Sequence, residues 1–273
     1  GSVDNRNIYL CLEDARERMD APPERGNGEG WILRAGGTDS PMDRGYRNGT
    51  VGISDKEETM METMIKVQEV SKQFKEVKVL DHVSMEVEKG SICGLIGVNG
   101  SGKTVLMKAI CGFLIPDAGE IYVNGKKIGA DCDFPDNTGI IIETPGFSPY
   151  ISGFRNLKTL ASIQKKIGDD KIRETMELVG LDPKSKKWVS KYSLGMRQRL
   201  GIAQAIMEDQ DILILDEPLN GLDKQGAADV RELLLRMKEQ GKTILLASHN
   251  TQDIDTLCDK VYEVDGGKVT QVG

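Results

Sequence analysis

The strongest chemical signal in the sequence is the run Gly97-Val98-Asn99-Gly100-Ser101-Gly102-Lys103-Thr104. It fits the phosphate-binding loop pattern Gly-x4-Gly-Lys-Thr, in which glycines let several backbone N–H groups approach one anion closely. The ammonium of Lys103 would add positive charge near the β and γ phosphates, and the hydroxyl of Thr104 would serve Mg²⁺. The spacing therefore predicts nucleotide chemistry rather than a glycine-rich turn that binds nothing.

Two carboxylates, Asp216 and Glu217, close an apolar run that begins at residue 211. Asp216 can hold the water shell of Mg²⁺, while Glu217 can polarise an attacking water molecule. The alternative is a strand that simply ends in two acids and Pro218. A phosphate loop in the same chain favours the catalytic interpretation.

Two further side chains are candidates by position. His249 is one of only two histidines and follows an apolar run at residues 243–247. Ligands bind at the carboxyl edge of such parallel sheets, so we expect His249 to contact the γ-phosphate. Phe74 lies between two early predicted strands, where its ring could stack on adenine or simply pack against the sheet. Position alone leaves both possibilities open for Phe74.

The periodicity of the chain predicts the elements that must position these residues. The phosphates should sit at a helix N-terminus, because an apolar strand precedes the loop and a helical segment follows it. Strands are predicted at residues 65–70, 83–87, 92–96, 119–123, 138–142, 211–215, 243–247, 261–264 and 268–272, with an Asn-Gly hairpin turn at 124–125 and a second hairpin turn at 266–267. Helices are predicted at residues 105–110, 156–167, 169–179, 195–207 and 224–240, and a short helix capped by Thr251 runs to residue 258.

Composition limits the possible functions. The 273 residues include 36 basic and 43 acidic ones, so wrapping of nucleic acid is not indicated. No run of about 18 apolar residues exists and no signal peptide opens the chain, so we expect any membrane role to come through a partner. The five cysteines lack a Cys-x-x-Cys spacing, which is typical of reduced cytosolic thiols.

Residues 1–60 differ in character from the rest. They hold seven arginines and one lysine, whereas residues 61–273 hold six arginines and 22 lysines. We interpret residues 1–60 as a non-native or disordered leader, with a translated upstream region and a natural start near Met60, Met61 or Met64 as the sharper hypothesis. A real regulatory extension is the alternative. Residues 61–273 form the predicted functional domain, with a helical insert at about residues 145–209.

The ordered set of motifs resembles the ATP-binding subunit of an ABC transporter. The distinguishing stretch is Tyr192-Ser193-Leu194-Gly195-Met196-Arg197-Gln198-Arg199-Leu200, which resembles the family signature. The resemblance implies an α/β P-loop NTPase fold with a RecA-like core, an antiparallel β subdomain and a helical insert. It also implies that Phe74 stacks on adenine, that Ser193 and Gly195 contact the γ-phosphate bound to an opposite subunit, and that the loop of residues 220–223 communicates across the dimer.

Two departures from the family pattern stand out. The signature has Tyr192, Leu194 and Met196 where the family usually has a leucine, a glycine and a glutamine. Glu143 stands where the family has a glutamine that ligates Mg²⁺. A carboxylate still ligates Mg²⁺ but adds negative charge near the phosphates. Glu143 and the residues around it are similar to exporters of the bacitracin-resistance and lantibiotic-immunity kind.

The resemblance implies an ATPase, with ATP and Mg²⁺, that powers export of a peptide antibiotic or similar amphipathic compound through separate permease subunits. Its place would be the cytoplasmic face of the cell membrane, and it would act as a homodimer or a pseudo-symmetric heterodimer. A non-transport ABC-type ATPase and a regulatory module without hydrolysis are the alternatives.

The predicted site residues fall into three groups. The candidate catalytic residues are Glu217, His249 and Lys103, and the candidate metal ligands are Thr104, Glu143 and Asp216. The candidate nucleotide-binding residues are Phe74, Gly97, Asn99, Gly100, Ser101, Gly102, Lys103, Thr104, Val105, Ser193 and Gly195.

Overall fold

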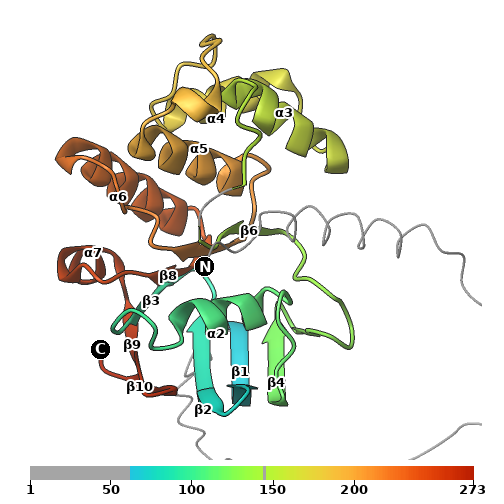
Figure 1. The fold of residues 1–273 in the computed structure, drawn as a ribbon, viewed down its shortest axis with the longest axis vertical. Helices are drawn as coiled ribbons and strands as arrows, with labels where there is room; N and C mark the ends of the chain where they lie inside the picture. Colours follow the sequence, from blue (N-terminus) through green and yellow to red (C-terminus); the bar gives the residue numbers. More distant parts are fainter. Residues whose placement is uncertain (1–61, 144–145) are drawn as a thin grey trace, which may run out of the picture. The chain divides into compact units, whose positions relative to one another are not determined.

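The structure is a computed structural model that describes residues 62–143 and 146–273. All of these residues belong to one unit, Met61–Gly273 (Figure 1). The expectations for residues 1–60, including the natural start and the regulatory alternative, lie outside the described residues.

A six-stranded sheet forms the centre of this unit, and its strands run in the order β10-β9-β3-β8-β7-β6. Its strands are β3 (Ile92–Ile96), β6 (Thr138–Ile141), β7 (Ile212–Asp216), β8 (Thr243–Ala247), β9 (Lys260–Asp265) and β10 (Lys268–Gln271). All neighbouring strands are parallel except the β9–β10 hairpin. The parallel register brings the carboxyl ends of β3, β6, β7 and β8 to one edge of the sheet. Every chemical motif except the signature stretch and Phe74 follows one of these ends.

A smaller antiparallel sheet has the strand order β2-β1-β4-β5. It contains β1 (Thr63–Phe74), β2 (Val77–Glu88), β4 (Ala118–Val123) and β5 (Lys126–Lys127). Asn124 and Gly125 connect the last two strands with φ angles of 49° and 73°, which is the backbone geometry that the predicted Asn-Gly turn requires. The antiparallel subdomain expected from the early strands is therefore present, with longer strands than predicted.

The helices fall into two groups. The sheet is accompanied by α2 (Lys103–Ile110), α6 (Lys224–Glu239) and α7 (Thr251–Leu257), and between β6 and β7 the chain forms α3 (Gly153–Gln164), α4 (Asp169–Leu178), the 3₁₀ turn η1 (Val189–Lys191) and α5 (Leu194–Ile206). Figure 1 shows α3, α4 and α5 together at the end of the unit opposite the antiparallel sheet. No helix among the described residues is long and apolar enough to cross a membrane.

Helices α2 and α5 begin slightly earlier than predicted, at Lys103 and Leu194, and at two further helix starts local caps outweigh periodicity. Helix α3 begins at Gly153 rather than at residue 156, since the Ser152 side chain accepts a hydrogen bond from the Arg155 N–H and caps the first turn. The cap of α7 is Asn250, whose Oδ1 accepts from the N–H of Gln252 at 3.0 Å. The prediction of Thr251 as this cap was wrong.

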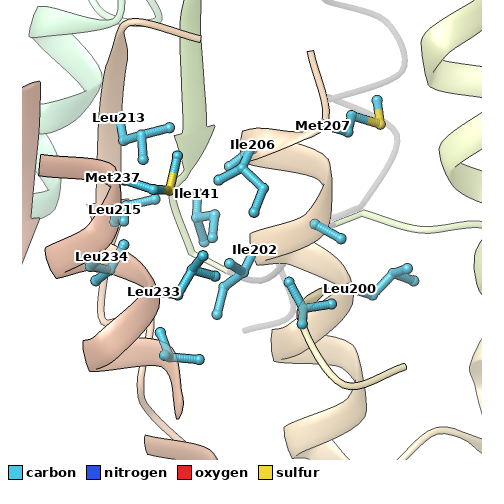
Figure 2. Close-up of a cluster of buried hydrophobic side chains, with 14 of the residues drawn as sticks. Ile141, Leu200, Ile202, Ile206, Met207, Leu213, Leu215, Leu233, Leu234 and Met237 are labelled. Carbon is cyan, nitrogen blue, oxygen red and sulfur yellow. The ribbon is translucent and has the colours of Figure 1, made fainter. Parts of the chain in front are cut away.

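The central sheet divides the hydrophobic core into two layers. Alternate residues of each strand point to opposite faces, so Leu213 and Leu215 of β7 join one cluster while Ile212 and Ile214 join the other. Figure 2 shows the first cluster, in which β7 faces Ile202 and Ile206 of α5 and α6 contributes further aliphatic side chains. The helix that begins with the signature stretch therefore shares a core with the strand that ends in the carboxylates.

Candidate functional site

The loop of residues 97–104 joins the end of β3 to the start of α2. Gly97, Gly100 and Gly102 have φ angles of 143°, 84° and 115°, a region that residues with side chains rarely adopt. A Cβ atom on Gly97 would also collide with the carbonyl oxygen of Val264 on β9. The glycines at these positions are therefore required by backbone conformation, and at Gly97 also by the closeness of β9.

Two side chains line the inside of this loop. Lys103 is only 6% exposed, and its Nζ donates to the carbonyl oxygens of Gly97 at 2.6 Å and Val98 at 3.1 Å. The Oγ of Ser101 is buried and has no hydrogen-bond partner among the residues that the structure describes. A buried hydroxyl without a partner costs about 1–3 kcal/mol. An anionic ligand with acceptor oxygens would satisfy Ser101 and meet the charge of Lys103, so these residues fit a phosphate group.

Asn99 and Val105, which were also predicted to bind the nucleotide, do not point side chains into the loop. Asn99 is exposed at the tip of the loop, and Val105 on α2 packs partly buried against the core cluster beneath the helix. The phosphate-binding role predicted for these two residues rests on their backbone rather than on side-chain contacts.

The hydroxyl of Thr104 donates a hydrogen bond to Oδ2 of Asp216 at 2.7 Å, across the edge of the sheet. Burial raises the pKa of Asp216 above its ordinary value, and the nearby charges of Glu217 and Glu143 raise this pKa further. The Thr104 hydrogen bond and the Lys103 ammonium oppose that shift. Hydroxyl and carboxylate oxygens are the donors that Mg²⁺ prefers, and its charge would relieve the repulsion among the acids. The donor set therefore fits Mg²⁺.

Glu217 and His249 form the pair that the sheet edge was predicted to bring together. The Oε2 of Glu217 lies 2.9 Å from Nδ1 of His249. The backbone N–H of Glu217 donates to the carbonyl oxygen of Ala247 at 3.0 Å, so the first residue past β7 stays beside the last residue of β8. With 23% of its side chain exposed, Glu217 can reach solvent while its orientation is fixed by the imidazole. This geometry suits a carboxylate that orients and polarises a water molecule.

Glu217 also has an unusual backbone. Its φ of 50° is uncommon for a residue with a side chain. The Nε2 of Gln198, on α5, donates to the backbone carbonyl oxygen of Glu217 at 3.2 Å. The signature stretch is therefore connected directly to the candidate general base.

Glu143, two residues beyond β6, forms an ion pair that was not predicted from the sequence. Its Oε1 lies 2.6 Å from Nζ of Lys108 on α2. The expected extra negative charge beside the phosphate site is present, but a lysine lies against it. The signal that could have suggested this pair is spacing, because Lys108 is four residues after Thr104 and so shares its helix face.

The signature residues lie at the start of α5. Ser193 is the N-cap, and its Oγ accepts a hydrogen bond from the N–H of Met196 at 3.2 Å. Ser193 and Leu194 are exposed, whereas Tyr192, in place of the usual leucine, is buried in the core. Among the described residues, no hydrogen bond or ion pair joins Ser193 or Gly195 to the loop of residues 97–104. The fold therefore presents the signature as a separate, outward-facing helix N-terminus.

A second loop fits tightly against that helix start. Gly221, with a φ of 77°, lies against Leu194, and a Cβ there would collide with the leucine side chain. A Cβ on Gly195 would approach the carbonyl oxygen of Gly221 to 3.1 Å. The loop of residues 220–223, which follows Glu217, and the signature stretch therefore constrain each other sterically.

Phe74 ends β1 at the hairpin that leads into β2. Its ring is 44% exposed, and Nζ of Lys72 lies 5.6 Å from the ring centroid. The hairpin strand β2 approaches the phosphate loop, since a Cβ on Gly102 would lie 3.0 Å from the carbonyl oxygen of Val79. Phe74 is thus an exposed aromatic residue at the hairpin whose second strand reaches the phosphate loop, and the adenine contact stays a prediction.

The comparisons with known proteins agree with this geometry. The family described as ABC transporter matches residues 80–220. The uncharacterized ABC transporter ATP-binding protein YybJ of Bacillus subtilis (strain 168) is 45% identical over 206 residues, which cover 76% of this chain and 94% of that protein. The bacitracin transport ATP-binding protein BcrA of Enterococcus faecalis is 37% identical over 214 residues, with 78% and 70% covered. The lantibiotic transport ATP-binding protein SrtF of Streptococcus pyogenes is 34% identical over 206 residues, with 76% and 89% covered.

Solved structures show the same fold. A structure of the ATP-binding subunit of an ABC transporter superimposes with a TM-score of 0.69 at 26% identity, covering 77% of this chain and 90% of that one. A dimeric structure of a bacterial ABC transporter cassette also gives a TM-score of 0.69, at 23% identity, with 76% and 96% covered. The predicted α/β P-loop NTPase fold is confirmed.

Proposed function

Because the chain belongs to the ABC transporter family as an ATP-binding subunit and ATPase, we propose that it powers export of a peptide antibiotic or similar amphipathic compound through separate permease subunits. The ATPase part of this proposal depends on one observation. Thr104 is hydrogen-bonded to Asp216, the next residue, Glu217, is paired with His249, and the buried Lys103 directly precedes Thr104. The names of the bacitracin and lantibiotic relatives support the transport half.

The residues of the loop hold the nucleotide in this proposal. The backbone N–H groups and Ser101 donate to phosphate oxygens, Lys103 carries the charge that meets the β and γ phosphates, and Phe74 stacks on adenine. Thr104, Asp216 and Glu143 hold Mg²⁺, which supplies positive charge against the phosphate oxygens. Glu217 orients and polarises water for attack on the γ-phosphate, and His249 holds the Glu217 carboxylate and contacts the same phosphate.

Completion of the site requires a second ATP-binding subunit. Ser193 and Gly195 stand at an exposed helix N-terminus, which favours anions. In a head-to-tail dimer, these residues of one subunit contact the γ-phosphate held by the other. Loss of the γ-phosphate on hydrolysis removes those contacts and loosens the dimer, and this opening and closing drives the permease at the cytoplasmic face of the membrane.

The test combines hydrolysis with assembly. Replacing Glu217 with glutamine should lower the hydrolysis rate by about 10²–10⁴-fold while ATP binding persists, so that light scattering shows an ATP-dependent dimer. Unchanged hydrolysis would remove Glu217 from the general-base role.

The transport part of the proposal has its own test. The protein should co-purify from membranes of its source organism with a hydrophobic polytopic protein, and deletion of its gene should raise sensitivity to bacitracin or a lantibiotic. Recovery on ribosomes or DNA instead would favour a non-transport ATPase.

A further inference from the structure

The further feature is the ion pair between Lys108 and Glu143. It joins the middle of α2 to the segment beyond β6, and the two atoms lie 2.6 Å apart. Each residue is linked to one of the candidate metal ligands. Lys108 is one helical turn after Thr104 and on the same face. Glu143 follows β6 by two residues, where the last pair of the β6–β7 ladder is Ile141 with Leu215, and its charge acts on Asp216 at the end of β7.

The local charges explain why such a pair is needed. Asp216, Glu217 and Glu143 place three carboxylates at one edge of the sheet, and the charges of Glu217 and Glu143 both act unfavourably on the ionised form of Asp216. Two lysines among the described residues oppose this charge: Lys103, inside the phosphate loop, acts on Asp216, and Lys108 lies against Glu143. A neutral glutamine at position 143 would not require a cation at position 108.

We propose that Lys108 is a positioning residue that balances Glu143, so that the pair occupies the place of a neutral amide and sets the affinity of the site for divalent cations. The proposal rests on the proposed metal role of Thr104, Asp216 and Glu143. Lys108 competes with the cation for the Glu143 carboxylate, and it also cancels the charge that Glu143 adds. The two residues therefore have opposite effects on cation affinity, and the effects cancel when both are neutral.

The test measures cation binding itself rather than turnover. The probe is Mn²⁺ in the presence of a non-hydrolysable ATP analogue, with bound and free Mn²⁺ distinguished by electron paramagnetic resonance. Lys108→Met should tighten Mn²⁺ binding and Glu143→Gln should weaken it, each by about two- to fivefold, because the pair is partly exposed and screened. The double variant should return close to the wild-type affinity. Both shifts should shrink at high salt.

Matched variants separate this effect from general charge or folding effects. Lys108→Arg keeps the charge and should retain the wild-type affinity. Lys126→Met removes a lysine from another 2.6 Å surface pair, with Asp136, and should leave Mn²⁺ binding unchanged. Equal shifts from Lys108→Met and Lys126→Met, or shifts of the same sign from Lys108→Met and Glu143→Gln, overturn the proposal.

One further variant distinguishes failure of the pair from failure of the proposed site. Asp216→Asn should weaken Mn²⁺ binding more than any change at the pair. If Asp216→Asn weakens binding while the Lys108 and Glu143 variants do not alter it, the pair has no role and the proposed metal site stands. If none of these variants alters Mn²⁺ binding, the metal site itself is wrong.

Discussion

The two halves of the proposed ATP site differ in how completely one chain builds them. The phosphate half is joined by direct contacts at the ends of three strands, β3, β7 and β8: Lys103 to its own loop, Thr104 to Asp216, and Glu217 to His249. The signature half is an exposed helix start whose Ser193 side chain contacts only its own helix. The proposed mechanism therefore lets one chain bind a nucleotide by itself, whereas it has the signature act on a nucleotide that another subunit holds.

The difference also appears in electrostatics. Buried charges meet at the phosphate half, where burial and neighbouring carboxylates raise the pKa of Asp216. The signature half relies on backbone N–H groups at the start of α5 and carries no acidic residue in its first turn. The two halves are nevertheless linked within the chain, because Gln198 of α5 donates to the Glu217 carbonyl oxygen and Leu194 lies against Gly221. Movement of the helical insert would therefore displace the candidate general base.

The largest effect on nucleotide binding should come from the phosphate half. Lys103→Met removes a buried charge that hydrogen-bonds inside the loop, and we expect ATP affinity to fall by about a hundredfold, since hydrogen bonds to charged groups contribute about 1.5–3 kcal/mol. Isothermal titration calorimetry measures this loss. Lys89→Ala, at an exposed ion pair with Glu62, should bind ATP as the wild type does. Equal affinity in the Lys103 variant would show that the loop binds phosphate without its lysine.

A change in the signature half should impair hydrolysis without weakening ATP binding. Gly195→Asp places a negative charge at the exposed start of α5, and we expect hydrolysis to fall at least about tenfold while ATP affinity of the monomer is unchanged, because like charges repel a partner's phosphate. The matched control is Gly168→Asp, at the exposed start of α4 in the same helical insert. Weaker ATP binding by the monomeric Gly195 variant would contradict the separation of the two halves.

Mixing these two defective chains sharpens the same prediction. A heterodimer of the Lys103 and Gly195 variants has one site with both defects and one site with none. Random pairing of two such chains should therefore restore hydrolysis to about a quarter of the wild-type rate, because half of the dimers are mixed and each mixed dimer has one intact site. Sites completed within a single chain would give no recovery.

Much of the phosphate half could be predicted from the sequence because its chemistry depends on local spacing. The strand and helix that flank the loop follow from apolar runs and glycine positions, and residues 92–96 and 243–247 match β3 and β8. Ends of parallel strands meet by geometry, which explains the predicted meeting of Asp216, Glu217 and His249. The Lys108–Glu143 and Gln198–Glu217 contacts were missed because they join residues 35 and 19 positions apart. Spacing places Lys108 on the same helix face as Thr104, but which residue it meets depends on packing between helix and sheet.

A smaller effect is expected at the edge of the phosphate half. Phe74→Ala should weaken ATP binding by about fivefold, near the lower end of the 1–3 kcal/mol found for stacking of a base on an aromatic ring, because the Phe74 side chain is 44% exposed. Phe74→Tyr keeps the ring and should retain binding. Phe134→Ala removes a ring with the same exposed fraction from another surface and provides the control. Similar losses in the Phe74 and Phe134 variants would indicate a nonspecific effect on folding.

The free energy of unfolding should also reveal the buried charge of the phosphate half. Asp216→Asn keeps an acceptor for the Thr104 hydroxyl but removes a buried charge that other carboxylates oppose, so the nucleotide-free protein should gain about 0.5–2 kcal/mol of unfolding free energy. Because the pKa of Asp216 is raised above 3.8 in the folded state, its ionisation destabilises the fold as pH rises past that value. The gain should therefore be full near neutral pH and shrink in acid. Thermal unfolding at several pH values measures it, and a loss of stability would show that the charge is compensated.

The smallest effect is expected at Ser193, because this signature residue is also the N-cap of α5. Its Oγ caps α5 by accepting the N–H of Met196 at 3.2 Å. Ser193→Ala should lower the unfolding free energy by about 0.5–1 kcal/mol, which corresponds to a fall in melting temperature of a few degrees. Ser193→Asp should keep the cap while placing a negative charge where the partner's phosphate would lie, so it should melt near the wild-type temperature yet hydrolyse ATP more slowly. If both variants hydrolyse ATP at the wild-type rate, Ser193 only caps its helix, and phosphate recognition by the signature half must come from Gly195 and the backbone of α5.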